Sequence, residues 1–134
     1  MNTIGNKYTE VTMKATDLRI GNLVLRKDLF DNKQKFKETI VCHNAITACY
    51  TNNDNFQPIP LTEEWLLKFG YKGRKDFKWN GSIVGIQIKD GKFYLGIKDL
   101  GNVLFHSVVE IKTVHHFQNL YYFLTNEELT YDIN

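Results

Sequence analysis

Several features that would assign a chain to a special class are scarce or missing in this sequence. No stretch of its 134 residues approaches the ~20 consecutive apolar residues of a membrane-spanning helix. Residues 1–8 also lack the apolar run of a signal peptide. The net charge of +2 is too small for the total alone to indicate a polyanion partner. We therefore expect a cytoplasmic protein that does not contact a membrane.

Cysteine is also scarce, and the side chains that could bind a metal are poorly spaced. Cys42 and Cys49 do not form a CxxC pair, and without an export signal we expect both to be reduced, buried or half-buried thiols. The four histidines show no HxxxH or HExxH spacing. The sequence predicts neither a metal nor a cofactor.

Catalytic motifs are missing too. The chain has no P-loop, dinucleotide fingerprint or nucleophile elbow. Cys42 and His43 supply a nucleophile and a base, but neighbours on an expected strand point to opposite faces. We therefore expect a protein that is not an enzyme.

The composition that is present is that of a globular domain. The chain is 43% hydrophobic and 13% aromatic with only two prolines, which excludes wholesale disorder. A chain of this length is one domain long and buries roughly two thirds of its surface. Because residues 1–12 are polar and aperiodic, we expect a flexible N-terminal arm followed by a single α+β domain over residues 13–134.

Two helices are predicted, one from capping residues and one from spacing. Thr62 is a good N-cap, Glu63 and Glu64 lie where the helix dipole favours carboxylates, and Gly70 suits the left-handed position after a helix. A second helix is predicted over residues 114–124, where apolar residues recur every three or four positions. Its stripe consists of Val114, Phe117, Leu120, Tyr121 and Leu124. This stripe needs an apolar surface to cover.

A β-hairpin is predicted around Asp90-Gly91, because a type I′ turn needs positive φ at both central residues. A two-residue turn pairs Lys89 with Lys92 and, outward from there, Val84 with Ile97. One face then carries only apolar side chains: Val84, Ile86, Ile88, Phe93, Leu95 and Ile97. A slip of one residue would mix the two faces, so the pattern specifies this register.

The same register places Gly85 opposite Gly96, and this pair has two interpretations. It leaves a flat spot between Gln87 and Tyr94 that a flat ligand or another backbone could approach. It also relieves crowding in a strongly twisted hairpin, which is the interpretation we favour.

The remaining strands complete the expected fold. Asn80-Gly81 is expected to close a second hairpin that pairs Phe77 with Val84 and places Phe77 on the apolar face. The result is an antiparallel meander over residues 77–106, covered by the C-terminal helix. Upstream, we expect a strand at residues 23–26 and, at residues 36–43 and 45–50, two strands or one bent strand. These form a small N-terminal sheet or a partly open SH3-like barrel, so the fold class is α+β.

Three blocks of the sequence, taken together and in this order, resemble a known family. They are LRIGN at residues 18–22, PIPLTEEWLLKFG at residues 58–70, and QNLY at residues 118–121 followed by LT and EEL. They resemble a family of small uncharacterised proteins encoded in Bacteroidota genomes, prophages and phages. Asn126 stands where that family has a glycine, and Asn tolerates the left-handed conformation. The resemblance implies a phage or mobile-element accessory protein inside a bacterial host cell, and it supplies no catalytic residues.

The best candidate for a binding site is a basic and aromatic segment over residues 71–79. Its cations are Lys72, Arg74, Lys75 and Lys78. Such residues can contact phosphates, while an exposed ring can stack on a base. Lys89, Lys92 and Tyr94, on the outer face of the expected hairpin, extend the same patch. In the competing interpretation, Phe77 and Trp79 face the core and the cations are merely solvated.

Two functions are favoured at this point, and an enzyme is the third and least supported. The first is a non-enzymatic accessory protein that binds a host protein, another macromolecule or a signal molecule, for instance to inhibit a defence system. The second is a small nucleic-acid-binding module that uses residues 71–79.

Overall fold

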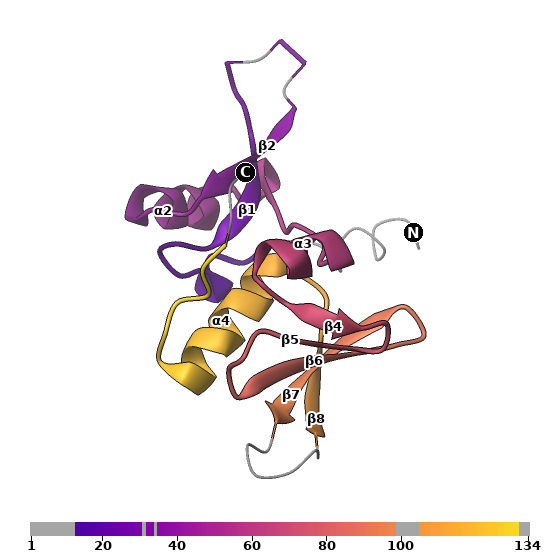
Figure 1. Cartoon of the computed structure of the whole chain (residues 1–134). Coiled ribbons are helices and arrows are strands. Elements are labelled where there is room, and N and C mark those ends of the chain that lie inside the picture. Colours follow the sequence, from indigo (N-terminus) through magenta and orange to yellow (C-terminus); the bar gives the residue numbers. More distant parts are fainter. Residues whose placement is uncertain (1–12, 31, 34, 99–104, 132–134) are drawn as a thin grey trace, which may run out of the picture. The chain divides into compact units, whose positions relative to one another are not determined.

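The computed structural model describes residues 13–30, 32–33, 35–98 and 105–131 (Figure 1). Within these ranges the protein is α+β, with two antiparallel sheets and no closed barrel. The described residues form two compact units that divide between Ile59 and Pro60. The arm expected at residues 1–12 lies outside the described ranges, and the single domain expected over residues 13–134 stays a prediction.

The first unit contains a small sheet with strand order β2-β1-β3 and one α-helix. Its elements are η1 (Ala15–Asp17), β1 (Leu23–Lys27), β2 (Phe36–Ile40), α2 (His43–Thr51), η2 (Asn53–Asn55) and β3 (Phe56–Gln57). β1 and β2 pair antiparallel, from Leu23 opposite Ile40 to Lys27 opposite Phe36. Of the two arrangements expected upstream, the small sheet is the one found.

The strand expected over residues 45–50 is wrong, because this segment belongs to helix α2. In a strand, Ala45, Thr47 and Cys49 would share one face. Instead Ala45 and Cys49, about one helical turn apart, are buried in the core of the first unit, and Thr47 is exposed. Burial of this helical face overrides the strand preference of the Ile, Thr and Cys residues. The strand expected over residues 36–43 likewise ends early, at Ile40.

The second unit is a five-stranded antiparallel sheet with strand order β4-β5-β6-β7-β8 and two helices. Its elements are α3 (Glu63–Lys68), β4 (Lys72–Arg74), β5 (Phe77–Trp79), β6 (Val84–Lys89), β7 (Lys92–Lys98), β8 (Phe105–Ile111) and α4 (Val114–Thr125). The meander expected over residues 77–106 is present and extends further at both ends. Helix α4 lies across one face of this sheet (Figure 1).

Helix α3 follows the predicted capping chemistry. Thr62 Oγ1 accepts a hydrogen bond from the Trp65 N–H at 3.3 Å. Gly70 has a φ of +82°, and the Tyr71 N–H beyond it donates to the Leu66 carbonyl oxygen at 2.8 Å, which is a Schellman closure. A helix this short is marginal alone, so buried side chains must hold it. They are Trp65, Leu66 and Phe69.

The hairpin of β6 and β7 has the predicted register, with all six predicted pairs present. Asp90 and Gly91 have φ values of +54° and +76°, as a type I′ turn requires. The apolar face is buried where it meets the core, at Val84, Ile86 and Leu95.

The connection from β5 to β6 is not the expected two-residue turn. Phe77 lies opposite Gln87, three residues beyond its expected partner. A type I′ turn cannot form because Gly81 has a positive φ but Asn80 does not. The Asn80 side-chain oxygen Oδ1 instead accepts a hydrogen bond from the Ser82 N–H at 3.0 Å, which stabilises a longer loop over residues 80–83.

Phe117 is at the centre of the packing between α4 and the sheet. It is fully buried, and its ring contacts those of Tyr71, Phe69 and Tyr121 edge-on, with centroid distances of 5.3, 5.6 and 6.4 Å. The predicted apolar stripe of α4 is found, with Val114, Phe117 and Tyr121 buried and Leu120 and Leu124 half-buried.

Both ends of α4 are capped. Thr113 Oγ1 accepts a hydrogen bond from the His116 N–H at 3.3 Å. Asn126 has a φ of +60° and donates its N–H to the Tyr122 carbonyl oxygen at 2.7 Å, so it takes the left-handed conformation that a glycine would adopt. With 12 residues α4 is too short to cross a membrane, and no other helix within the described ranges is long and apolar enough to do so.

Replacing Phe117 with Ala should lower the free energy of unfolding by about 3–5 kcal/mol, because a fully buried ring is lost and a cavity remains. Phe123→Ala, on the same helix, is the matched control. Its ring is 83% exposed, so the change should stay within about 0.5 kcal/mol. Urea titration followed by tryptophan fluorescence measures both variants. Equal losses would contradict this packing of α4.

Candidate nucleic-acid interface

The five-stranded sheet has one face against α4 and one face turned away from it, here named the outer face. Residues that lie directly opposite each other on neighbouring strands share a face. The outer face therefore carries Lys72, Arg74, Phe77, Trp79, Gln87, Lys89, Lys92, Tyr94, Lys98, Ser107 and Glu110. Cations and aromatic rings dominate this set.

These side chains stand in rows that cross the strands. One row is Arg74, Phe77, Gln87, Tyr94 and Glu110. The next row is Lys72, Trp79, Gly85, Gly96 and Ser107. Each row thus begins with a cation on β4 next to an aromatic ring on β5.

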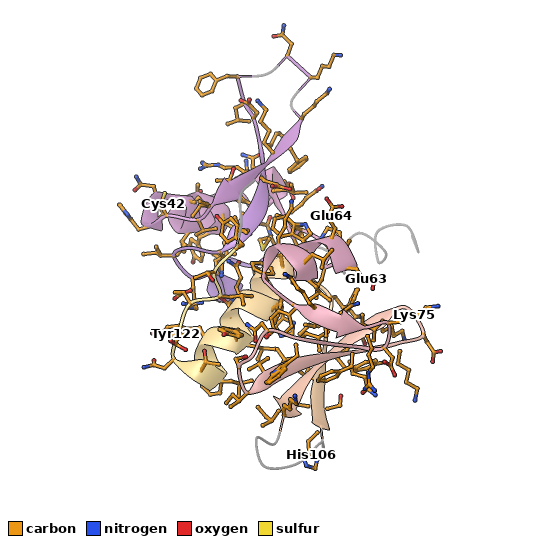
Figure 2. The ribbon with its side chains drawn as sticks, viewed as in Figure 1. Cys42, Glu63, Glu64, Lys75, His106 and Tyr122 are labelled. Carbon is orange, nitrogen blue, oxygen red and sulfur yellow. The ribbon has the colours of Figure 1, made fainter. Side chains whose placement is uncertain are left out.

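The structure brings most of the predicted site residues together. Those on the outer face are Lys72, Arg74, Lys89, Lys92 and Tyr94. Lys75 lies in the turn between β4 and β5 (Figure 2). Lys78 lies opposite Ile86 and is therefore on the face that α4 covers.

Among the cations and aromatic rings of the outer face, three were not predicted from the sequence as site residues: Phe77, Trp79 and Lys98. Phe77 was expected on the apolar face, but the longer loop places both Phe77 and Trp79 on the outer face, where they are half-buried. Lys98 was missed although its signal was available. In the predicted hairpin register, side chains alternate strictly along β7, which already places Lys98 on the same face as Tyr94.

Trp79 and Lys98 form one unit on this face. The Lys98 Nζ lies 3.3 Å from the centroid of the Trp79 ring, a cation–π contact. The Trp79 Nε1–H donates to the Ser82 carbonyl oxygen. Because Lys98 covers one side of the indole, Tyr94 is the ring better placed to stack on a ligand.

A polar network holds the loop at one end of the outer face. The buried Tyr71 hydroxyl donates to the Val84 carbonyl oxygen at 2.9 Å. The Ser82 hydroxyl donates to Asn80 Oδ1 at 2.7 Å, and Asn80 Nδ2 donates to the Tyr121 hydroxyl at 3.4 Å. Burial raises the pKa of Tyr71, so its hydroxyl stays protonated. The loop that sets the face of β5 is therefore tied to α4.

Positive charge is concentrated in this sheet. Between Lys72 and Lys98 the sequence has seven cations and two carboxylates, whereas the whole chain has 17 and 15. The remaining residues therefore carry 10 cations and 13 carboxylates and are net negative. The small total charge conceals a strongly basic surface.

Four of these cations lie near one end of the sheet. The Ile88 N–H donates to the Asp76 carbonyl oxygen at 2.8 Å, which places the turns at residues 75–76 and 90–91 side by side. The cations around these turns are Arg74, Lys75, Lys89 and Lys92. The Arg74 Nε lies 3.7 Å from Asp76 Oδ1, and both side chains are largely exposed, so this ion pair contributes little.

The paired glycines do not form an open spot. Gly85 and Gly96 lie opposite each other as predicted. Both are buried although the outer face is turned away from α4. Neighbouring side chains therefore cover the position where a flat ligand would approach.

Other reactive groups belong to the first unit. Cys42 and Cys49 are free thiols. Cys49 is buried, but Cys42 is exposed at the start of α2 and not buried or half-buried as expected (Figure 2). A hydrogen bond from the Ala45 backbone N–H lowers the pKa of Cys42, whereas burial raises the pKa of Cys49. Across the described ranges, no three side chains of His, Cys, Asp or Glu gather as metal ligands would.

Comparison with protein-family models, curated proteins and solved structures gave no match. The resemblance to a Bacteroidota and phage family therefore stays a prediction from the sequence.

Cys42 should react with iodoacetamide at a lower pH than an ordinary thiol, because a lowered pKa populates the reactive thiolate at lower pH. Its rate should rise as the pH increases through that pKa and then level off. Cys49 should react only after unfolding in urea. Timed labelling followed by peptide mass spectrometry measures both, with Cys42→Ser as the control. A Cys42 profile identical in folded and denatured protein would contradict this expectation.

Proposed function

We propose that this protein is a non-enzymatic nucleic-acid-binding module that holds a single strand on the outer face of its five-stranded sheet. The observation that supports it most is the row of Arg74, Phe77 and Tyr94, which puts a cation and two rings on one open face. Proteins bind single strands by combining a basic surface that follows the phosphates with rings on which bases stack.

The shape of this surface favours a single strand over a duplex. Five strands spaced about 4.8 Å apart span roughly 19 Å, which is wider than the ~12 Å major groove of DNA. Stacking on Tyr94 also requires a base with an accessible flat face, and bases in a duplex are already stacked on one another.

The proposal selects one ligand class from those left open by the sequence. It keeps the expectation of a binding protein without catalytic activity, and it names nucleic acid rather than a host protein or signal molecule. An origin in a phage or mobile element and a place in the bacterial cytoplasm are parts of the same proposal that rest on sequence alone.

Neutralising cations of the outer face should weaken binding of a fluorescein-labelled oligothymidine, measured by anisotropy at several salt concentrations. Arg74→Gln and Lys92→Gln should each reduce the affinity, and each lost phosphate contact should reduce the salt slope by about 0.7. Tyr94→Ala should cost about 1–3 kcal/mol of binding free energy with an unchanged slope, because stacking releases no counterions.

Lys78→Gln is the matched control for these variants. Lys78 lies on β5 between Phe77 and Trp79 but on the opposite face of the sheet, so its loss should leave affinity and slope nearly unchanged. Circular dichroism checks that each variant is folded. Equal effects of Lys78→Gln and Arg74→Gln, or no binding by the unmodified protein at low salt, would refute the outer face as the binding surface.

A further inference from the structure

The first unit has a basic surface of its own, on the hairpin of β1 and β2. Residues 26–37 contain five cations and two carboxylates. Apart from this segment and residues 72–98, the chain has only five cations and 11 carboxylates. The hairpin extends beyond α2 (Figure 1), which leaves its outer half uncovered by that helix.

The outer half of the hairpin contains a shallow pocket with a volume of about 350 Å³, at the lower end of the range for small-molecule sites. Its lining residues are Arg26, Lys27, Asp28, Leu29, Phe30, Lys37 and Thr39. Arg26 lies directly opposite Lys37, so these two cations share a face. Three cations and one carboxylate give the pocket a net positive charge.

Asp28 organises this pocket. Its Oδ2 lies 2.9 Å from the Lys37 Nζ, and its Oδ1 accepts a hydrogen bond from the Phe30 N–H at 3.0 Å. The Asp28 N–H donates to the Lys35 carbonyl oxygen at 2.8 Å. The start of the turn is thereby held in one conformation, with the Phe30 ring 99% exposed.

The two sides of the pocket suit two parts of one ligand. The Arg26 guanidinium lies 5.0 Å from the centroid of the Phe56 ring, and stacking of this kind places its N–H groups at a defined position for a phosphate. Phe30 and Leu29, which is 59% exposed, offer a flat apolar surface. Two such side chains are too small an apolar area to anchor a membrane.

We propose that this pocket binds a nucleotide, with its phosphate at Arg26 and Lys37 and its base against Phe30. Arginine and lysine are the usual partners of phosphate, and an exposed ring stacks on any base. The nucleotide could be free in solution or part of a strand, and the chemistry of recognition is the same. The site belongs to the first unit and does not depend on the outer face.

Phe30→Ala should weaken binding at this pocket by roughly 5-fold or more, because it removes the stacking ring. The probes are fluorescently labelled AMP and the labelled oligothymidine, each titrated into a protein that also carries Arg74→Gln and Tyr94→Ala to weaken the outer face. Tyr50→Ala is the matched control, since Tyr50 is 81% exposed in the same unit but does not line the pocket. It should leave both affinities unchanged.

Variants that change the charge of the pocket test whether the ligand is negatively charged. Asp28→Asn keeps an oxygen that can accept the Phe30 N–H but removes a negative charge beside the phosphate, so affinity should rise. Lys37→Gln should lower it, and Lys14→Gln, an exposed lysine outside the pocket, should not. If Asp28→Asn does not strengthen binding and Lys37→Gln does not weaken it, the charge of the phosphate does not govern binding and the inference is wrong.

The two probes distinguish the sources of the nucleotide. Binding of AMP that depends on Phe30 supports a site for free nucleotide. Binding of the oligothymidine alone, with the same dependence, supports a site for one nucleotide of a strand. If neither probe binds, or if Phe30→Ala and Lys37→Gln bind both probes as well as the parent does, the pocket is not a nucleotide site. The outer-face variants are measured separately. A negative result at the pocket would therefore not refute the proposed function.

Discussion

The pairing of β6 with β7 is the constraint on which the second unit depends. Every other strand of the sheet pairs with this hairpin directly or through β5, so the alternation of its side chains extends across the sheet. Phe117 and Tyr121 of α4 can be buried because Val84, Ile86 and Leu95 form a continuous apolar face beneath the helix. The same alternation leaves cations and rings on the opposite face. The register of this hairpin therefore determines both the packing against α4 and the composition of the candidate site.

The composition of that opposite face depends on a second, smaller feature, the loop over residues 80–83. A two-residue turn would shift β5 by three residues along β6, and an odd shift moves every side chain of a strand to the other face. Phe77 would then face α4. Hydrogen bonds from Ser82 to Asn80 and from Asn80 to Tyr121 stabilise the longer loop. A few polar contacts therefore decide whether the rings of β5 are core residues or surface residues.

The two units present similar chemistry on different scaffolds. The outer face combines Arg74 with Tyr94 across a sheet, and the hairpin pocket combines Arg26 with Phe30 at a turn. On the outer face, strand pairing places a cation and a half-buried ring in one row, and at the hairpin a cation and an exposed ring line one pocket. The acidic residues elsewhere balance these basic regions, which is why the net charge of +2 does not reveal them. Local potential, not total charge, attracts an anionic ligand.

The sequence by itself determined what depends on neighbours a few residues away: the caps of α3 and α4, the turn at residues 90–91 and the β6–β7 register. It also identified four of the five cations of the outer face but missed Lys98, and it included Lys78, which lies on the opposite face. Tertiary structure decided the rest. Helix α2 forms because Ala45 and Cys49 find burial against distant segments, which local strand preference cannot indicate. The face of Phe77 depends on a loop tied to Tyr121, 41 residues beyond Asn80, and no local pattern encodes a contact over that separation.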